Sequence, residues 1–129
     1  TTEIYTLSLH DALPILREVC NMSNEELEVV ADVYEMGRSI CTNLANIILL
    51  LKNRKIVEDG DLELLKKQIE FDIKRYMMLA TNKLCCEAAE YIRNFIRNYV
   101  HDSIDDYERD HMIPILENLQ KKFENIINN

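Results

Sequence analysis

The chain has 129 residues, of which 29% are charged, and its formal net charge is −8. This length fits one domain of ordinary size. The longest apolar run, Ile47 to Leu51, is far shorter than the roughly 18 residues of a membrane span. An acidic chain without a basic cluster is poorly suited to nucleic acid, because that binding neutralises phosphates with Lys and Arg. We therefore expect neither a membrane nor a nucleic-acid partner.

The opening stretch, TTEIYTLSLHDALPI, does not have the features of a targeting signal. Glu3 stands where a signal peptide carries a basic residue, and Pro14 would break the helix that the signal needs. Translated in one reading frame, a widely used sequencing adapter resembles residues 1–15 without a mismatch. Scars of this kind are set aside before a fold is argued.

The next residues are also interpreted as lying outside the native protein. The codons for Arg17 to Val19 can contain a ribosome-binding sequence, placed a short spacer ahead of an ATG at Met22. We expect residues 1–21 to be a non-native leader without regular structure, and residues 22–129 to form a single helical-bundle domain. A genuine N-terminal tail over residues 16–21 is the alternative.

A first helix is predicted to begin at Ser23. Glu26 follows three residues later, which is the spacing of a capping box. Apolar positions then repeat at alternating steps of three and four residues, as in a heptad seam, and Gly60 marks the end of this segment. The seam positions are Leu27, Val30, Tyr34, Gly37, Cys41, Leu44, Ile48 and Leu51.

A second helix is predicted to begin near Asp61 and to keep one helical phase over about 38 residues. A single long helix is the simplest interpretation, and the polar stretch Thr81 to Lys83 is the place where it could break. The predicted inward positions are Leu62, Leu65, Ile69, Ile73, Tyr76, Ala80, Leu84, Ala88, Ile92, Phe95 and Tyr99.

A last helix is predicted after a polar corner, where Asp102 or Ser103 would cap it, with a kink or restart at Pro114. Its predicted inward residues are Met112, Ile115, Leu119, Phe123 and Ile126. The predicted fold class is all-α, an antiparallel bundle of three long helices, or of four if the second breaks near Thr81–Lys83.

The number of helices decides the expected oligomeric state. A second helix of full length would extend beyond its neighbours and leave part of its apolar stripe uncovered, which a symmetric dimer would bury. We therefore expect a homodimer. A break near Thr81–Lys83 would let four shorter helices close on themselves, and the argument for a dimer would disappear.

The cysteines beyond the leader are Cys41, Cys85 and Cys86. An odd number with one adjacent pair matches neither a disulfide framework nor a zinc-ligand spacing, so we expect a reducing, cytoplasmic location. Free cysteine is among the most buried residue types, so core packing is favoured over a redox role for Cys85 and Cys86.

The densest group of reactive side chains lies between residues 97 and 111. If this stretch were helical throughout, His101, Asp105, Glu108 and His111 would share one face. Glu108 and His111 have the Glu-x-x-His spacing of carboxylate-bridged di-iron bundles. Only two histidines lie beyond the leader, so a complete di-iron set cannot be assembled. These four residues are metal-ligand candidates, and we expect neither a metal nor another cofactor.

Arg97-Asn98 stands before His101, and MIPILENLQKKF follows from Met112. These features resemble HEPN-type helical bundles, many of which cleave RNA. The resemblance implies that Arg97 steadies a phosphate and that His101 acts on the 2′-hydroxyl. Three residues separate Arg97 from His101, fewer than the family pattern has, although both would share a helix face four residues apart.

No catalytic set is complete, which leaves enzyme activity undecided. We expect a small acidic helical module that binds a protein partner or itself, of the regulatory kind found in phages and mobile elements of bacteria. HEPN-like RNA cleavage or RNA binding with Arg97 and His101 is the alternative. The tyrosines beyond the leader fit either a helix seam or an interface. They are Tyr34, Tyr76, Tyr91, Tyr99 and Tyr107.

Overall fold

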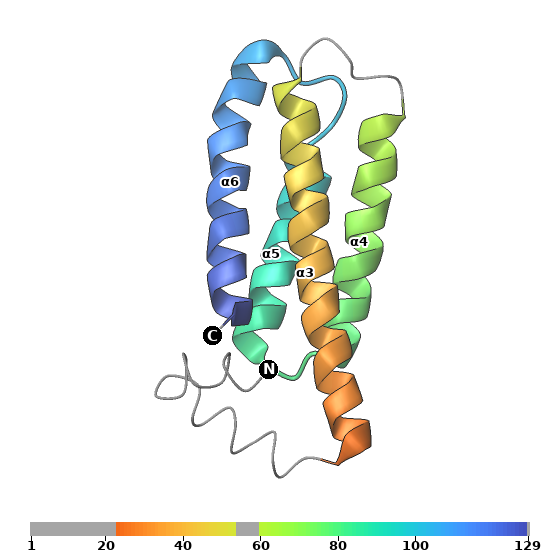
Figure 1. The fold of residues 1–129 in the computed structure, drawn as a ribbon. Coiled ribbons are helices and arrows are strands. Elements are labelled where there is room, and N and C mark those ends of the chain that lie inside the picture. The colour runs from red at the N-terminus through yellow and green to blue at the C-terminus, as the bar shows by residue number, and fades with distance from the viewer. Residues whose placement is uncertain (1–22, 54–59, 129) are drawn as a thin grey trace, which may run out of the picture. The chain divides into compact units, whose positions relative to one another are not determined.

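The structure is a computed structural model, which describes residues 23–53 and 60–128 (Figure 1). The expected leader, residues 1–21, lies outside the described residues. The chain divides into two compact units, residues 1–32 and 33–129, and the boundary falls inside the first helix. All regular structure in the described residues is α-helical, which confirms the fold class. The helices are α3 (Asn24–Lys52), α4 (Asp61–Leu79), α5 (Lys83–Tyr99) and α6 (Asp106–Asn128).

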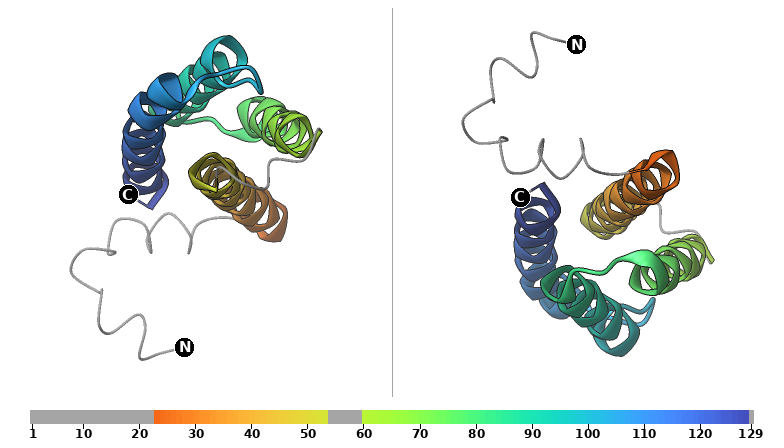
Figure 2. Two further views of the ribbon diagram at one scale, coloured as in Figure 1. Left: turned by 90° about the horizontal axis from the view of Figure 1, so that it is seen from above. Right: turned by 90° about the horizontal axis from the view of Figure 1, so that it is seen from below.

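Within the second unit, successive helices run antiparallel and form a four-helix bundle (Figures 1 and 2). Contacts between α3 and α6 close the ring of helices. Gln120 Nε2 donates to the Cys41 carbonyl oxygen at 3.2 Å, and Lys52 Nζ lies 3.3 Å from Glu117 Oε2. Each helix therefore covers part of the apolar face of its two neighbours.

The start of α3 confirms the predicted cap, because the Glu26 amide donates to Ser23 Oγ at 3.2 Å. Of the predicted seam, the positions from Gly37 to Leu51 are buried, whereas Tyr34 is exposed. A second row on the same helix, which includes Ile40 and Ile47, is also buried. A helix inside a four-helix bundle meets neighbours on two sides, so it buries a wider stripe than a simple seam.

The second predicted helix is two helices, and the break lies at residues 80–82. Ala80 has an extended conformation, with φ −71° and ψ 134°, and its amide donates to the Tyr76 carbonyl. Asn82 then caps α5, because its side chain accepts a hydrogen bond from the Cys85 amide at 3.1 Å. Asparagine is among the best capping residues. The prediction of a single long second helix is therefore wrong, and the alternative of four helices is confirmed.

The break also resets the helical phase. Leu84 and Tyr99, which a continuous helix would turn inward, are more than half exposed. The buried positions of α5 are Cys85, Ala89, Ile92 and Ile96. The prediction that Cys85 packs in the core is confirmed, and Cys86 is half-buried.

The last helix begins later than predicted. Asp105 is its capping residue, because Asp105 Oδ1 accepts from the Glu108 amide at 2.8 Å, so the assignment to Asp102 or Ser103 is wrong. Pro114 lies inside α6, which does not restart there. Ile115 is exposed and the neighbouring Leu116 is fully buried, so the predicted inward row is shifted by one residue at that point.

One charged side chain is buried among the described residues. The Asp72 carboxylate of α4 accepts hydrogen bonds from Ser39 Oγ at 2.8 Å, from Asn43 Nδ2 and from Gln68 Nε2 at 3.3 Å. A buried carboxylate is costly unless its oxygens are hydrogen-bonded. Two of these neutral donors, Ser39 and Asn43, lie on α3 and therefore fix the register of α4 against α3, whereas Gln68 lies on α4 itself.

Gly37 allows a close approach, although to side chains and not to another backbone. A Cβ atom there would lie 3.3 Å from Tyr76 Cε2 and 3.3 Å from Ile127 Cδ1. The Tyr76 ring in turn packs edge-on against Phe123, with ring centroids 5.8 Å apart. The missing side chain lets α4 and α6 both press against α3 at this level.

Leu44→Ala and Ile92→Ala should each lower the free energy of unfolding by about 2–5 kcal/mol, the usual cost of emptying a fully buried site. Both side chains are at most 1% exposed. Lys67→Ala, at an exposed position, is the control and should change stability little. Equal small effects in chemical denaturation would contradict this assignment of the core.

Asn82→Ala should lower the free energy of unfolding by about 1 kcal/mol, because the cap on the Cys85 amide is lost. Asn94→Ala is the matched control, an exposed asparagine in the middle of α5, where alanine is neutral or slightly stabilising. Urea denaturation of both variants checks this. The capping role would be contradicted by two variants of equal stability.

Candidate functional site

A groove with a volume of about 600 Å³ lies between α5 and α6. We call it the tyrosine groove, because three tyrosines that are more than half exposed stand on its walls. It collects residues that the sequence analysis had treated separately, as metal candidates, nuclease candidates or ambiguous aromatics. Its lining is Tyr91, Phe95, Asn98, Tyr99, His101, Tyr107, Glu108, His111, Met112 and Ile115.

The walls of the tyrosine groove are two helix faces. On α5, Tyr91, Phe95 and Tyr99 follow one another at steps of four residues, which places them on one side of the helix. The rings of Phe95 and Tyr99 have centroids 5.1 Å apart and are inclined by 43°. This contact holds both rings along the wall of the groove.

The wall on α6 is built around Tyr107 and His111. Their ring centroids are 4.1 Å apart, and His111 Nδ1 lies 2.9 Å from the Tyr107 carbonyl oxygen. A carbonyl oxygen can only accept, so His111 Nδ1 carries the proton and donates.

The corner between α5 and α6 brings His101 to the groove. Val100 and Ile104 are buried, and the residues between them are exposed. The two apolar side chains anchor the corner in the core, so the polar residues between them turn outward. His101 Nδ1 lies 2.8 Å from Ser103 Oγ, which holds the ring at one end of the groove.

The surroundings of the tyrosine groove are acidic. Glu108 belongs to the lining, and the corner with the first turn of α6 adds Asp102, Asp105 and Asp106. One cation lies in that turn, Arg109, whose Nη1 is 2.7 Å from Asp106 Oδ1. A ligand in this groove therefore meets aromatic rings and an excess of carboxylates.

The structure does not bring Arg97 and His101 together on a helix face. α5 ends at Tyr99 and Val100 is extended, so His101 lies beyond the helix. Arg97 instead forms an ion pair with Glu70 of α4 and is not part of the groove lining. RNA cleavage with these two residues stays a prediction, and its geometric premise is wrong.

The four metal-ligand candidates do not share a face either. The stretch from His101 to Asp105 is not helical, Asp105 caps α6, and His111 is bound to the Tyr107 carbonyl. Among the described residues, no group of three or more His, Cys, Asp or Glu side chains is placed to hold a metal ion.

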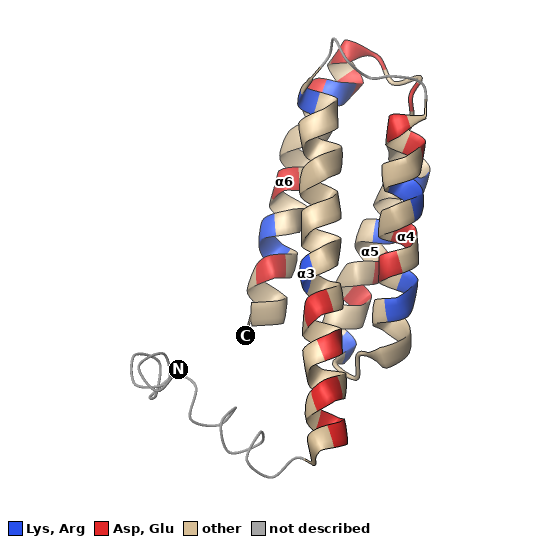
Figure 3. Ribbon diagram, turned by 45° about the vertical axis from the view of Figure 1, so that its right-hand side comes forward, with Lys and Arg blue, Asp and Glu red and all other residues tan. Residues whose placement is uncertain are grey.

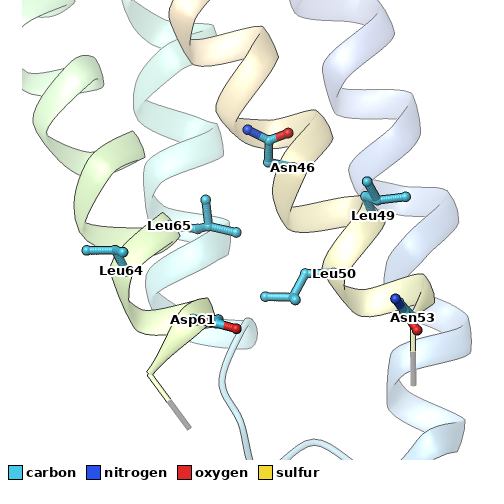
Figure 4. Close-up of a pocket in the computed structure, with 7 residues that line it drawn as sticks. All are labelled: Asn46, Leu49, Leu50, Asn53, Asp61, Leu64 and Leu65. Carbon is cyan, nitrogen blue, oxygen red and sulfur yellow. The ribbon is translucent and has the colours of Figure 1, made fainter. Parts of the chain in front are cut away.

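A second cleft, of about 470 Å³, lies between the end of α3 and the start of α4 (Figure 4). Leu50 and Leu65 extend into the space between these helices, whereas Leu64 points away from α3. The polar part of the lining is Asn46, Asn53 and Asp61. Asp61 is the one ionisable side chain in this lining.

Two of the thiols have a raised pKa. Burial, with a smaller contribution from the nearby Glu124 carboxylate, raises the pKa of the Cys41 thiol to about 11. Burial also raises the pKa of Cys86, with a smaller effect from Cys85, and it raises that of the Tyr76 hydroxyl. Since the thiolate is the reactive form of cysteine, Cys41 and Cys86 are poor nucleophiles at neutral pH.

Two features, one of the interior and one of the surface, were not predicted from the sequence. The polar cluster of Asp72 was not predicted, although Ser39 and Asn43 stand four residues apart on the inner side of α3 and gave a signal. The pairing of Tyr107 and His111 into one wall of the groove was also missed, because that stretch was read as a charged corner.

No described helix is both long enough and apolar enough to cross a lipid bilayer. The chain matches no protein-family model, no curated protein sequence and no solved structure.

Alkylation of Cys41 at pH 8 should be about 100-fold slower in the folded chain than in the chain unfolded by guanidinium, because its thiolate is correspondingly rarer. Iodoacetamide labelling resolved by peptide mass spectrometry measures this residue separately from the others. Equal rates in the folded and unfolded chains would contradict the burial of Cys41.

Proposed function

We propose that this chain is a protein-interaction module of a regulatory or accessory kind, and that the tyrosine groove receives a segment of a partner protein. The observation that carries the proposal is the arrangement of exposed Tyr91, Tyr99 and Tyr107 along two facing helices. The volume of the groove lies within the range of about 300–1,000 Å³ that is usual for ligand sites.

Tyrosine suits such a surface for a physical reason. Its ring contributes a large apolar area at a small cost in side-chain entropy, and its hydroxyl stays hydrated before the partner arrives. Tyrosine is accordingly enriched among the residues that dominate binding energy. Phe95 and Met112 provide an apolar floor on which a partner side chain can be buried.

The charge around the groove supports a basic partner segment. A Lys or Arg side chain can lie over a tyrosine ring through a cation–π contact while its charge faces Glu108. The aspartates of the corner extend the negative potential beyond the lining. We therefore propose a partner segment that combines apolar and basic side chains.

The number and spacing of Cys41, Cys85 and Cys86, which fit no disulfide framework, support a cytoplasmic location for this interaction. Self-association is the other form that protein binding could take. A homodimer was expected because one long second helix would leave apolar surface uncovered, and that helix is broken at residues 80–82. The homodimer thus stays a prediction, without the long helix on which it was based.

Light scattering tests the oligomeric state. Because four helices cover one another's apolar faces, we expect a mass near 15.2 kDa at micromolar concentration. A doubled mass that falls to the monomer value in Tyr107→Ser would instead show that a second copy occupies the tyrosine groove.

Panning a random peptide phage library against the chain tests the proposed function. Enriched peptides should share apolar and basic residues, and Tyr99→Ser and Tyr107→Ser should weaken their binding about 10-fold or more. Leu49→Ser, an exposed apolar position outside the groove, is the matched control and should bind as the wild type does.

If the peptides bind Tyr99→Ser, Tyr107→Ser and Leu49→Ser with equal affinity, the tyrosine groove is not their binding site. A labelled RNA, incubated with the wild type and with His101→Ala, is the second arm. Cleavage by the wild type that His101→Ala abolishes would contradict the interaction module and favour the RNA-cleaving alternative.

A further inference from the structure

Three exposed apolar side chains form a row on the outer face of α4, and a fourth, Leu79, is 43% exposed at the last residue of the helix, about 80° around it from Phe71. Leu64, Phe71 and Met78 are 69%, 54% and 75% exposed. They stand seven residues apart, so they lie almost in line on the helix surface over about 21 Å. We call these three residues the α4 seam. None of them lines the tyrosine groove.

Basic side chains border the α4 seam on both sides. At about 100° per residue, Lys67 and Lys74 fall within about 60° of Phe71 on one side, and Arg75 falls within that angle on the other. The guanidinium carbon of Arg75 lies 5.5 Å from the centre of the Phe71 ring. In Figure 3, α4 carries blue basic segments as well as red acidic ones, in a chain whose net charge is −8.

The carboxylates of α4 lie about 80–100° around the helix from Phe71, and Asp61 is among them, at the first residue of the helix. Glu63 is paired with Lys66 at 3.5 Å, and Glu70 is paired with Arg97 of α5. Asp72 is buried and bound by neutral donors. The solvent-facing sector of α4 therefore combines an apolar row with a positive potential, opposite in sign to the protein as a whole.

We propose that the α4 seam is a second docking surface, and that its occupant is an acidic amphipathic helix of another protein. Side chains repeated every seven residues are the pattern through which one helix packs against another. The cations beside the α4 seam correspond to the charged positions that flank a coiled-coil seam. Cations at such positions form salt bridges with carboxylates on the partner helix. An acidic helix should therefore bind the α4 seam more tightly than a neutral helix does.

Charge disfavours a second copy on this face. In an antiparallel pair of α4 helices centred on Phe71, each Lys67 would lie opposite Arg75 of the other copy. A parallel pair would place each cation beside its own counterpart. Both arrangements oppose like charges, so the α4 seam disfavours pairing with itself.

The same observations disfavour an anionic lipid surface or nucleic acid. A membrane-binding helix inserts a wide apolar face, whereas the α4 seam is one side chain wide. The net charge of −8 repels both polyanions from the chain at long range. An acidic helix carries far fewer charges and contacts only the basic sector.

Two synthetic four-heptad peptides with leucine at the a and d positions test this proposal. One carries glutamate at e and g, and its twin carries lysine there. Because the tyrosine groove favours basic peptides, the comparison uses the full chain with Y99S/Y107S. By fluorescence anisotropy, the glutamate peptide should bind this chain at least about 10-fold more tightly than the twin does. Phe71→Ser should weaken it about 10-fold or more, and K67E/K74E/R75E should reverse the preference.

Y99S/Y107S in the tyrosine groove, compared with the wild type, is the matched control and should leave the affinity for the glutamate peptide unchanged, so this test is independent of the proposed function. Circular dichroism checks that each variant is folded. Equal binding of both peptides, or binding that Phe71→Ser does not weaken, would overturn the proposal. So would a Phe71-dependent dimer in light scattering, or Phe71-dependent sedimentation with phosphatidylserine vesicles.

Discussion

The hydrogen bond from the Cys85 amide to Asn82 Oδ1 starts a new helix where the apolar pattern alone would continue the old one. Ala80 is extended just before it, so α5 turns back and runs antiparallel to α4 (Figure 1). Without this break, a helix from residue 61 to residue 99 would be about 57 Å long, and no other described helix could cover it. The four-helix bundle therefore depends on the break at residues 80–82.

Both proposed surfaces follow from the same break. Turning α5 back sets its phase, so that Cys85 faces the core and Tyr91 and Tyr99 face outward beside α6. The inner side of α4 is then occupied by α3 and α5, and Phe71 is left on the outer side. The groove is bordered by carboxylates and the α4 seam by cations. A module with two surfaces of opposite sign could bridge two different partners.

Much of the fold could be predicted from the sequence, because helical periodicity and capping chemistry act locally. The Ser23 cap and the buried Cys85 are examples, and the polar stretch at Thr81 to Lys83 located the break within a residue or two. What could not be predicted depended on neighbours in space. Asp72 is buried because donors on α3 reach it, which the sequence around it does not encode. The tyrosine groove needed α5 and α6 side by side.

A distance between labels at positions 67 and 94 tests the helix break most directly. Both positions are exposed and lie almost equally far from the break, on α4 and α5. Bio-orthogonal spin labels there, measured by pulsed electron paramagnetic resonance, should give a distance below about 20 Å, because packed helices have axes about 8–10 Å apart. A distance near 40 Å, the length of 27 residues of unbroken helix at about 1.5 Å each, would contradict the four-helix bundle and the two surfaces that depend on it.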